Sequence, residues 1–556
     1  MLVGQPASGR VLQCRDMVAE ILEHLAPGWP REGSSKPEER ARQRDMRFRT
    51  LASAALVSKL FSELALDVLW RVLDDIDVLL ELFPSLKEHQ HYGSTIRVLD
   101  EVTPEHWARF QQYARRVRAL RSADSVPRVH ASVWTLLESL CKGKPLLPNL
   151  RRLKMGLYVQ NPAGFMLLVS PSLQNLEMTF YHGSVKSYRV AYSEQHVAPA
   201  AGILLQLILS KVPNLCTLSV EDGLEGLAPR HLKSLTLLKE LQNLNLLFSG
   251  VSVDFATIHE LSHGRPLRSL DLALGTGFAK NRTAAPFGDA FRNLRTISLS
   301  GHSKDLVCFF DAATLDSLTE AYLTVADAPD VATWRGRLSS ILAEVPKSIK
   351  LFHFFFEKKL SPPMQHLAYL FEPCLSFPNI TAFEVELSTN TPHASDADLF
   401  KFAYAWPKLE FFSVQYEVIA LQPRASIRTP RQVQPTLASL ISFAQLCPSL
   451  FNLYLPAIDV TQVPSKDSVP LVRHSALRNL QFSKGLHRGA TANLLDVAVI
   501  IDMLFPKIDT TRSVVLTEQT PSSIPRPPPS DNRATPWGLT RVLLAAMQAR
   551  REQEEP

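Results

Sequence analysis

A short apolar pattern recurs along most of this chain. Twelve segments match LxxLxL or a close variant of it, and they begin at residues 150, 173, 215, 241, 267, 294, 318, 349, 380, 409, 450 and 477. Side chains alternate between the two faces of a strand, so the apolar positions within each copy share one face. Each copy therefore predicts a short strand with one buried side.

A helical or irregular stretch and a turn separate one copy from the next. Residues 396–414, DADLFKFAYAWPKLEFFSV, show the unit plainly, with a helical pattern, then Trp-Pro, then the strand pattern. Proline lacks a backbone N–H and disfavours helix in the residue before it, so it ends the helix locally. One such unit cannot bury its apolar face alone, whereas a stack of units buries a continuous core.

The repeats predict the fold class. The expected architecture is α/β, with a solenoid of the leucine-rich-repeat type over residues 145–519. Parallel strands are expected on its concave face, and helices or loops outside. Successive copies start 23 to 42 residues apart. The longer intervals predict loop insertions, because leucine-rich repeats have a period of about 20 to 29 residues.

The regions outside the repeats predict further segments. Residues 1–73 indicate a small all-helical module, with a charged flexible insertion at 28–50 that contains Gly, Pro and Ser. Residues 74–144 look mostly helical and are expected to connect this module to the solenoid and to begin it. Trp107, Phe110 and Tyr113 recur there at helical spacing. Residues 520–536 are dense in proline and predict an extended linker, and 537–556 predict one amphipathic helix.

Composition and charge argue against several classes of protein. The chain has 46% hydrophobic and 21% charged residues, and no apolar run approaches the ~20 residues that span a bilayer, so no membrane partner is expected. The N-terminus lacks the basic and apolar regions of a secretion signal, and the six cysteines are widely scattered. A cytoplasmic or nuclear location is therefore expected. The net charge of +6 is mild, and the basic stretch at residues 115–121 lacks interleaved aromatic side chains, so no nucleic-acid partner is expected.

One short motif resembles a catalytic zinc site. His259, Glu260 and His263 fit the HExxH pattern, in which two histidines one helical turn apart bind zinc and the glutamate acts as a base. A glycine and a proline stop the helix directly afterwards, and no glutamate follows before Glu320 to act as a third ligand. We interpret the match as chance, and we expect no catalytic residue, no metal site and no cofactor.

The helical N-terminus carries a family likeness. Residues 12–25, LQCRDMVAEILEHL, and residues 51–70, with the phrase ALVSKLFSELALDVLW, resemble an F-box. An F-box is the helical module that docks onto the small adaptor subunit of cullin-type ubiquitin ligases. The segment that follows, to residue 121, is similar to the large F-box families of mushroom-type fungi, whose remaining chain is a leucine-rich solenoid. Family members commonly have Leu-Pro where this chain has Leu12 and Gln13, and the insertion at 28–50 is long for the family.

The resemblance implies a set of adaptor-binding residues and two partners, the adaptor and a cullin. The residues are apolar positions of the two helical segments: Leu12, Val18, Ile21, Leu22, Leu25, Leu56, Val57, Phe61 and Leu69. The alternative for each is that it builds the core of the module itself. Some of them must do so.

Positions beside the buried leucines predict what the concave face carries. Its charged residues are Arg152, Lys154, Glu177, Glu221, Asp271, Glu320, Glu384 and Glu386. Acids outnumber bases there, although the whole chain has 60 bases and 54 acids. Aromatic outward positions come later in the chain, and exposed aromatic side chains favour binding. The predicted client-binding residues are Tyr322, His353, Phe355, Glu384, Glu386, Phe411 and Tyr454. The alternative is that residues 352–356, FHFFF, belong to the core in another register.

These features together favour a non-catalytic binding protein. The preferred interpretation is a substrate-recognition subunit of a cullin-type (SCF) ubiquitin ligase. Its N-terminal module would bind the adaptor, and its concave face would bind a client protein, for which a basic segment is expected. The other interpretation is a leucine-rich-repeat scaffold with no ubiquitin role, whose N-terminal helices only cap the solenoid.

Overall fold

The chain forms two compact units. Unit 1 comprises Met1–Val251 and Gly264–Pro266, and unit 2 comprises Ser252–His263 and Leu267–Pro556. The computed structural model describes residues 13–26, 37–91, 94–121, 129–159, 162–181, 197–262, 265–281, 286–360, 365–387, 392–416, 433–466, 469–470, 474–486, 492–511 and 536–554. Both units are built of parallel strands and helices, so the predicted α/β class is confirmed.

Unit 1 begins with helices and continues with a parallel sheet. Its helices are α2 (Arg15–Glu23), α3 (Pro37–Ala54), α4 (Lys59–Leu69), α5 (Asp77–Leu80), α6 (Pro104–Ala114), α7 (Ala131–Cys141), α8 (Ala163–Leu168), α9 (Val197–Lys211) and the 3-10 helix η2 (Pro229–Leu237). Its strands are β1 (Val72–Leu73), β2 (Leu86–His91), β3 (Ser94–Leu99), β4 (Ala119–Arg121), β5 (Arg152–Tyr158), β6 (Asn175–Tyr181), β7 (Thr217–Val220) and β8 (Asn243–Asn245). The parallel strands follow the order β1-β4-β5-β6-β7-β8, whereas β2 and β3 pair with each other in antiparallel orientation.

Unit 2 alternates strands and helices along its length. Its strands are β9 (Ser252–Val253), β10 (Ser269–Leu274), β11 (Thr296–Gly301), β12 (Glu320–Val325), β13 (Leu351–Phe356), β14 (Ala382–Leu387), β15 (Phe411–Tyr416), β16 (Asn452–Asp459) and β17 (Asn479–Leu486). Its helices are α10 (Phe255–Ser262), η3 (Phe278–Asn281), η4 (Gly288–Phe291), α11 (Ser303–Ala312), α12 (Val331–Ala343), α13 (Leu367–Leu370), η5 (Glu372–Ser376), α14 (Asp396–Ala405), α15 (Leu437–Leu446), α16 (Ala492–Leu504) and α17 (Pro536–Glu554). Strands β10 to β17 lie side by side in chain order, and β9 pairs with β10.

Each predicted repeat forms a strand, and neighbouring repeats within a unit are in register. Strands β5 to β8 and β10 to β17 each begin two residues after the first position of their copy. The middle apolar positions pair along one row, as Leu270 does with Ile297 and Phe383 with Phe412. All pattern positions except Met155 are buried. A slip of one residue would turn these side chains to the other face, so their burial fixes the register.

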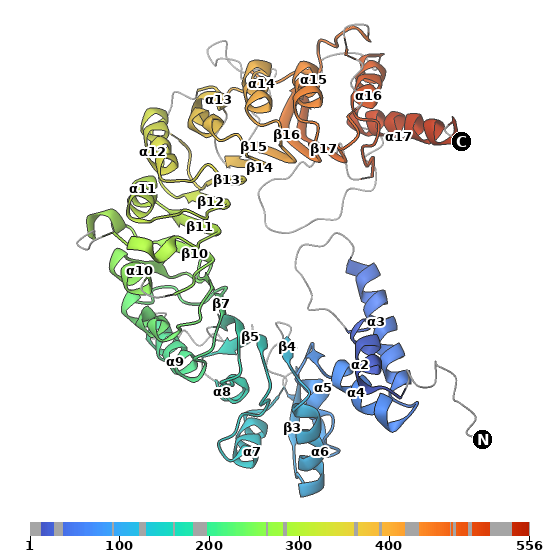
Figure 1. The fold of residues 1–556 in the computed structure, drawn as a ribbon, viewed down its shortest axis with the longest axis vertical. Coiled ribbons are helices and arrows are strands. Elements are labelled where there is room, and N and C mark those ends of the chain that lie inside the picture. The colour runs from blue at the N-terminus through green and yellow to red at the C-terminus, as the bar shows by residue number, and fades with distance from the viewer. Residues whose placement is uncertain are drawn as a thin grey trace. The chain divides into compact units, whose positions relative to one another are not determined.

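Helices cover one face of the sheet in unit 2. Helices α11, α12, α14 and α15 lie in a row beside the strands (Figure 1). The Trp334 ring of α12 lies 5.0 Å from Phe356, and the Phe402 ring of α14 lies 5.5 Å from Phe383. All four of these side chains are fully buried, so the helix-covered face of the sheet forms the core of unit 2. Burial of each contributes about 1.5–3 kcal/mol to folding. We call the opposite face of strands β10 to β16 the open face.

The N-terminal segment is helical, but its division differs from the prediction. Residues 37–50, expected to be part of a flexible insertion, belong to α3, and residues 27–36 lie outside the described residues. Gln, Arg and Met have high helix propensity, and Arg49 and Asp45 form an ion pair of 2.8 Å one turn apart. The apolar run at 51–70 is divided in two, because Ser58 caps α4 by accepting a hydrogen bond from the backbone N–H of Phe61.

The connector at 74–144 is mixed rather than mostly helical. The predicted apolar stripe of α6 is confirmed, with Phe110 buried and stacked 4.9 Å from Phe83. The β2–β3 hairpin was not predicted, because Lys87, Glu88 and the polar residues after them carry no apolar alternation. Strands β1 and β4 precede β5 in the sheet, so the connector does begin the parallel array.

The C-terminal helix predicted at 537–556 is present as α17, whereas the predicted linker lies outside the described residues apart from Pro536. Leu544 of α17 is buried, and Gln548 donates hydrogen bonds to the backbone oxygens of Pro506 and Ile508. Helix α17 therefore packs against the end of α16. No helix in the described part of the chain is both long and apolar enough to cross a bilayer.

Candidate protein-binding surfaces

Outward side chains of the open face form three adjacent rows across the strands. The middle row runs from β10 to β16 through Asp271, Ser298, Tyr322, His353, Glu384, Ser413 and Tyr454. The row nearer the amino ends of the strands contains Glu320, Leu351, Ala382, Phe411 and Asn452. The row nearer the carboxyl ends contains Thr324, Phe355, Glu386 and Gln415. Neighbours in a row are about 4.8 Å apart, so they can contact one ligand together.

The open face brings together all seven predicted client-binding residues. Each of them occupies one of the three rows and is half-buried. Phe352, Phe354 and Phe356 are fully buried, whereas His353 and Phe355 between them point outward. The predicted register of this aromatic strand is therefore correct, and the alternative register is excluded.

Charged side chains are compensated differently in the two units. In unit 1, the Lys154 ammonium lies 3.1 Å from a carboxylate oxygen of Glu177 and 3.2 Å from one of Glu221. In unit 2, strands β10 to β16 contain no lysine and no arginine. The open face of unit 2 nevertheless carries four carboxylates: Asp271, Glu320, Glu384 and Glu386.

Partial burial makes Asp271, Glu384 and Glu386 costly to ionise. Burial raises the pKa of Asp271 to about 6. It also raises the pKa of Glu384 and that of Glu386; for Glu386, His353 opposes the rise and the neighbouring Glu384 charge adds to it. The open face therefore carries incompletely hydrated negative charge, which a cation from another molecule would stabilise.

His353 does not supply that cation. Its ring lies edge-on to Tyr322 at 5.8 Å, and its Nδ1 is 3.9 Å from Oε2 of Glu384. Burial lowers the pKa of His353, although the charge of Glu386 opposes this, so the ring is mainly neutral near pH 7. Its Nε2 is buried and makes no hydrogen bond with the described residues.

The sequence did not predict a role for two open-face residues, Ser413 in the middle row and Gln415 in the carboxyl-end row. Ser413 is fully buried on the open face, and the side-chain amide of Gln415 donates a hydrogen bond of 3.3 Å to its hydroxyl. Beside them, the rings of Phe411 and Tyr454 lie 5.5 Å apart. The alternation that identified Phe411 also marks Ser413 and Gln415, but neutral polar side chains carry no sequence signal for binding.

The predicted adaptor-binding residues separate into core and surface. Val18 and Leu22 are buried in the module's core, and Leu25, Phe61 and Leu69 pack partly buried against it. Assigning Val18 and Leu22 to a docking surface was therefore wrong, because they lie one turn apart on the side of α2 that faces this core. Leu12 lies outside the described residues.

Three predicted adaptor-binding residues remain exposed. Leu56 is 89% and Val57 is 68% exposed in the turn between α3 and α4, and Ile21 on α2 is 46% exposed. Sequence reasoning missed Met17, which is exposed one helical turn before Ile21. Met17 could have been found from the sequence, because residues four apart lie on the same face of a helix, as Met17 and Ile21 do. Large exposed apolar side chains grouped on one small module are typical of a protein-binding surface.

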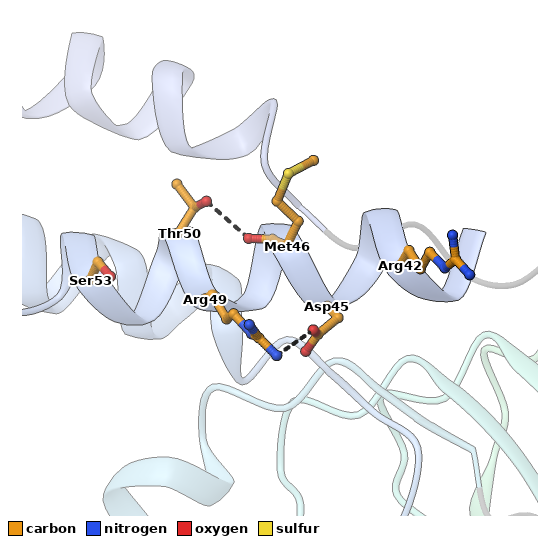
Figure 2. A pocket seen from close by; sticks show the side chains of 6 residues that line it. All are labelled: Arg42, Asp45, Met46, Arg49, Thr50 and Ser53. Atoms are coloured by element: carbon orange, nitrogen blue, oxygen red, sulfur yellow. Dashed lines mark hydrogen bonds and ion pairs between the residues drawn. The ribbon is translucent and has the colours of Figure 1, made fainter. Parts of the chain in front are cut away.

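A shallow hollow on the module does not have the geometry of an active site. Figure 2 shows the side chains that line it, which are Arg42, Asp45, Met46, Arg49, Thr50 and Ser53. All of them project from one side of α3. Their interactions stay within that helix, since Arg49 pairs with Asp45 and the Thr50 hydroxyl donates to the backbone oxygen of Met46. Among the described residues, the hollow is lined by α3 alone.

The HExxH-like motif lies partly on α10. That helix ends at Ser262, and His263 lies outside the described residues. His259 is half-buried, with its ring 6.4 Å from that of Phe287. Within the described ranges, no group of three or more His, Cys, Asp or Glu side chains is placed to hold a metal ion.

Comparison with known proteins does not assign a family. No protein-family model matches the chain, and no curated protein sequence matches it significantly. The F-box resemblance therefore stays a prediction.

Proposed function

We propose that this protein is a non-catalytic substrate-recognition subunit of a cullin-type ubiquitin ligase. Its repeats are of the leucine-rich type, and its helical module α2–α4 is an F-box that binds the adaptor. The open face of unit 2 binds the client. The client's lysines are then modified by other subunits, and the contribution of this chain is to raise their effective concentration.

The open face of unit 2 is the observation that carries this proposal. An in-register sheet displays four carboxylates with interleaved aromatic side chains, and its strands β10 to β16 contain no lysine or arginine. Aromatic side chains supply large contact area, and uncompensated charge selects partners of opposite sign. Such a face supports recognition of a partner that carries basic residues.

The surface of the helical module supports the adaptor role. Ile21, Leu56 and Val57 remain exposed although the module has its own core of buried residues on α2, α3 and α4. Burial of one such side chain against a partner would contribute about 1.5–3 kcal/mol. These side chains do not belong to the buried core of the module, so burial against a docking partner would explain why they are apolar.

Adaptor capture tests this half of the proposal. The full chain should co-purify with the adaptor subunit and cullin when they are expressed together. Ile21→Asp or Leu56→Asp should reduce capture by about tenfold or more, because each places a charge in an apolar contact. The matched control is Leu237→Asp, since Leu237 on η2 is 57% exposed but lies outside the module.

These surface variants are more informative than core variants. Leu22 and its neighbours build the module, so a charge there would unfold it whatever its partner. If the unaltered chain captures no adaptor, or if Ile21→Asp and Leu56→Asp capture as much as Leu237→Asp, the ubiquitin-ligase role is wrong.

A second candidate function is a repeat scaffold with no ubiquitin role. It is favoured by contacts that join the module to the connector at 74–144 within unit 1. The Trp70 ring lies 4.6 Å from Tyr113 on α6, and Arg116 donates a hydrogen bond of 3.0 Å to the backbone oxygen of Glu63 on α4. Such contacts are expected if the N-terminal helices only cap the end of the solenoid. The scaffold interpretation predicts normal client binding without any adaptor capture.

A further inference from the structure

The carboxylates of the open face are arranged periodically. They occur on every second strand, with Asp271 on β10, Glu320 on β12, and Glu384 and Glu386 on β14. The strands between them present neutral or basic-capable side chains in the middle row, namely Ser298 on β11 and His353 on β13. A ligand that crosses the strands therefore meets negative charge on every second strand, with Asp271 and Glu384 in the middle row and Glu320 two residues nearer the amino ends of the strands.

This interval matches one extended conformation of a peptide. Two strand spacings amount to about 9.6 Å. A polyproline II helix rises about 3.1 Å per residue with three residues per turn, so its side chains at every third residue point the same way about 9.3 Å apart. In a β-strand, residues three apart point to opposite faces, so a strand cannot present three basic side chains at this interval.

Tyr322 lies among these carboxylates. Its hydroxyl is 3.4 Å from Oε2 of Glu320. Burial raises the pKa of Tyr322 to about 12, and the charges of Glu320, Glu384 and Asp271 add to the rise. The Tyr322 phenol on β12 therefore lies within reach of carboxylate charges on β10, β12 and β14.

We propose that the open face binds a segment of the client in polyproline II conformation, laid across the strands, with basic side chains at every third residue facing Asp271, Glu320 and Glu384. The residues between them contact Tyr322 and Phe355, and residues beyond the one that faces Glu384 contact Phe411 on β15, since aromatic surfaces are suited to this preformed and proline-rich conformation. This inference deepens the proposed function, because it specifies the client's binding segment.

Two synthetic peptides of the same composition test the spacing. One has arginine at every third residue with prolines between, and the other has the same arginines at every second residue. Titrated against the full chain at low salt, the three-residue spacing should bind at least about tenfold more tightly. Equal binding of the two peptides would show that charge alone is recognised, and no binding of either would also overturn the inference.

Single isosteric variants assign the contacts. Asp271→Asn, Glu320→Gln and Glu384→Gln should each weaken the matched peptide by about threefold to tenfold and leave the mismatched peptide less affected. Glu177→Gln is the control, because Lys154 already pairs with Glu177 in unit 1. Its binding should equal that of the unaltered chain. If the open-face variants behave like this control, the proposed contacts are wrong.

The outcome is independent of the ubiquitin-ligase proposal. Spacing-dependent peptide binding without adaptor capture would reject the ligase role and keep the inference. Adaptor capture without peptide binding would keep the ligase role and reject the inference. Thermal unfolding of each variant, compared with the unaltered chain, separates loss of binding from loss of folding.

Discussion

At the scale of single residues, the open face retains charges that weaken the fold. Burial raises the pKa of Asp271, Glu384 and Glu386, which means that the folded chain holds these carboxylates less favourably than water does. No lysine or arginine on strands β10 to β16 offsets this. A fold selected for stability alone would place neutral side chains there, so these charges support the proposal that the open face binds a ligand.

Replacement of Asp271 measures this penalty. Its folded pKa of about 6 lies above the ordinary value of 3.8, so between these pH values the folded state binds more protons than the unfolded state. The free energy of unfolding therefore falls as pH rises through that window. Asp271→Asn should flatten this dependence and gain about 1 kcal/mol near pH 7, with allowance for partial exposure, and little near pH 4.

Chemical unfolding at the two pH values makes the comparison. Glu177→Gln should not gain stability near pH 7, because it removes an ion pair with Lys154. An Asp271→Asn variant that is no more stable than the unaltered chain near pH 7 contradicts the argument that desolvation dominates at this position.

At the scale of elements, the last helix closes unit 2. Leu544 of α17 is 1% exposed, Arg551 pairs with Asp502 of α16, and Gln548 binds backbone oxygens after α16. These contacts cover the side of α16 that would otherwise face solvent. Helix α17 is therefore part of the folded unit.

A charge at Leu544 should detach this helix. Leu544→Asp would bury an unpaired carboxylate at a cost of several kcal/mol, so α17 should dissociate and expose α16. Amide hydrogen exchange in Ala492–Leu504 should then accelerate, while β11 to β14 stay protected. Val542 lies on the same helix but is 48% exposed, so Val542→Asp is the control and should leave exchange unchanged. Equal exchange in the two variants would show that α17 does not stabilise α16.

Local pattern predicted the strands but not every element between them. Each repeat strand depends on three apolar residues close in sequence, such as Leu450, Leu453 and Leu455, so alternation identified it. The hairpin β2–β3 depends instead on Arg97, which pairs with Asp77, Glu81 and Glu88 at 3.0 to 3.5 Å. Charge pairing of this kind leaves no periodic signal.

Prediction of the two surfaces was limited by long-range contacts. Alternation placed Tyr322 and Glu384 on one face correctly, because it needs only the strand register. It could not show that Lys154 neutralises Glu221, which is 67 residues away in sequence. Nor could it divide Val18 from Ile21, since only the packing of α2 against the core decides which one is buried.

At the scale of the whole molecule, each unit has one proposed binding role. The module in unit 1 is proposed to bind the adaptor, and the open face of unit 2 is proposed to bind the client. Because these surfaces share no residues, variants at one should leave binding at the other intact. The two roles can therefore be separated in a single purification experiment.

The most direct test of the account is affinity purification of the unaltered chain beside the double variant Glu384→Lys and Glu386→Lys. We predict that both chains capture the adaptor and cullin, and that only the unaltered chain captures a client with regularly spaced basic residues. Capture of the same proteins by both chains would contradict the claim that the open face of unit 2 is the client-binding surface.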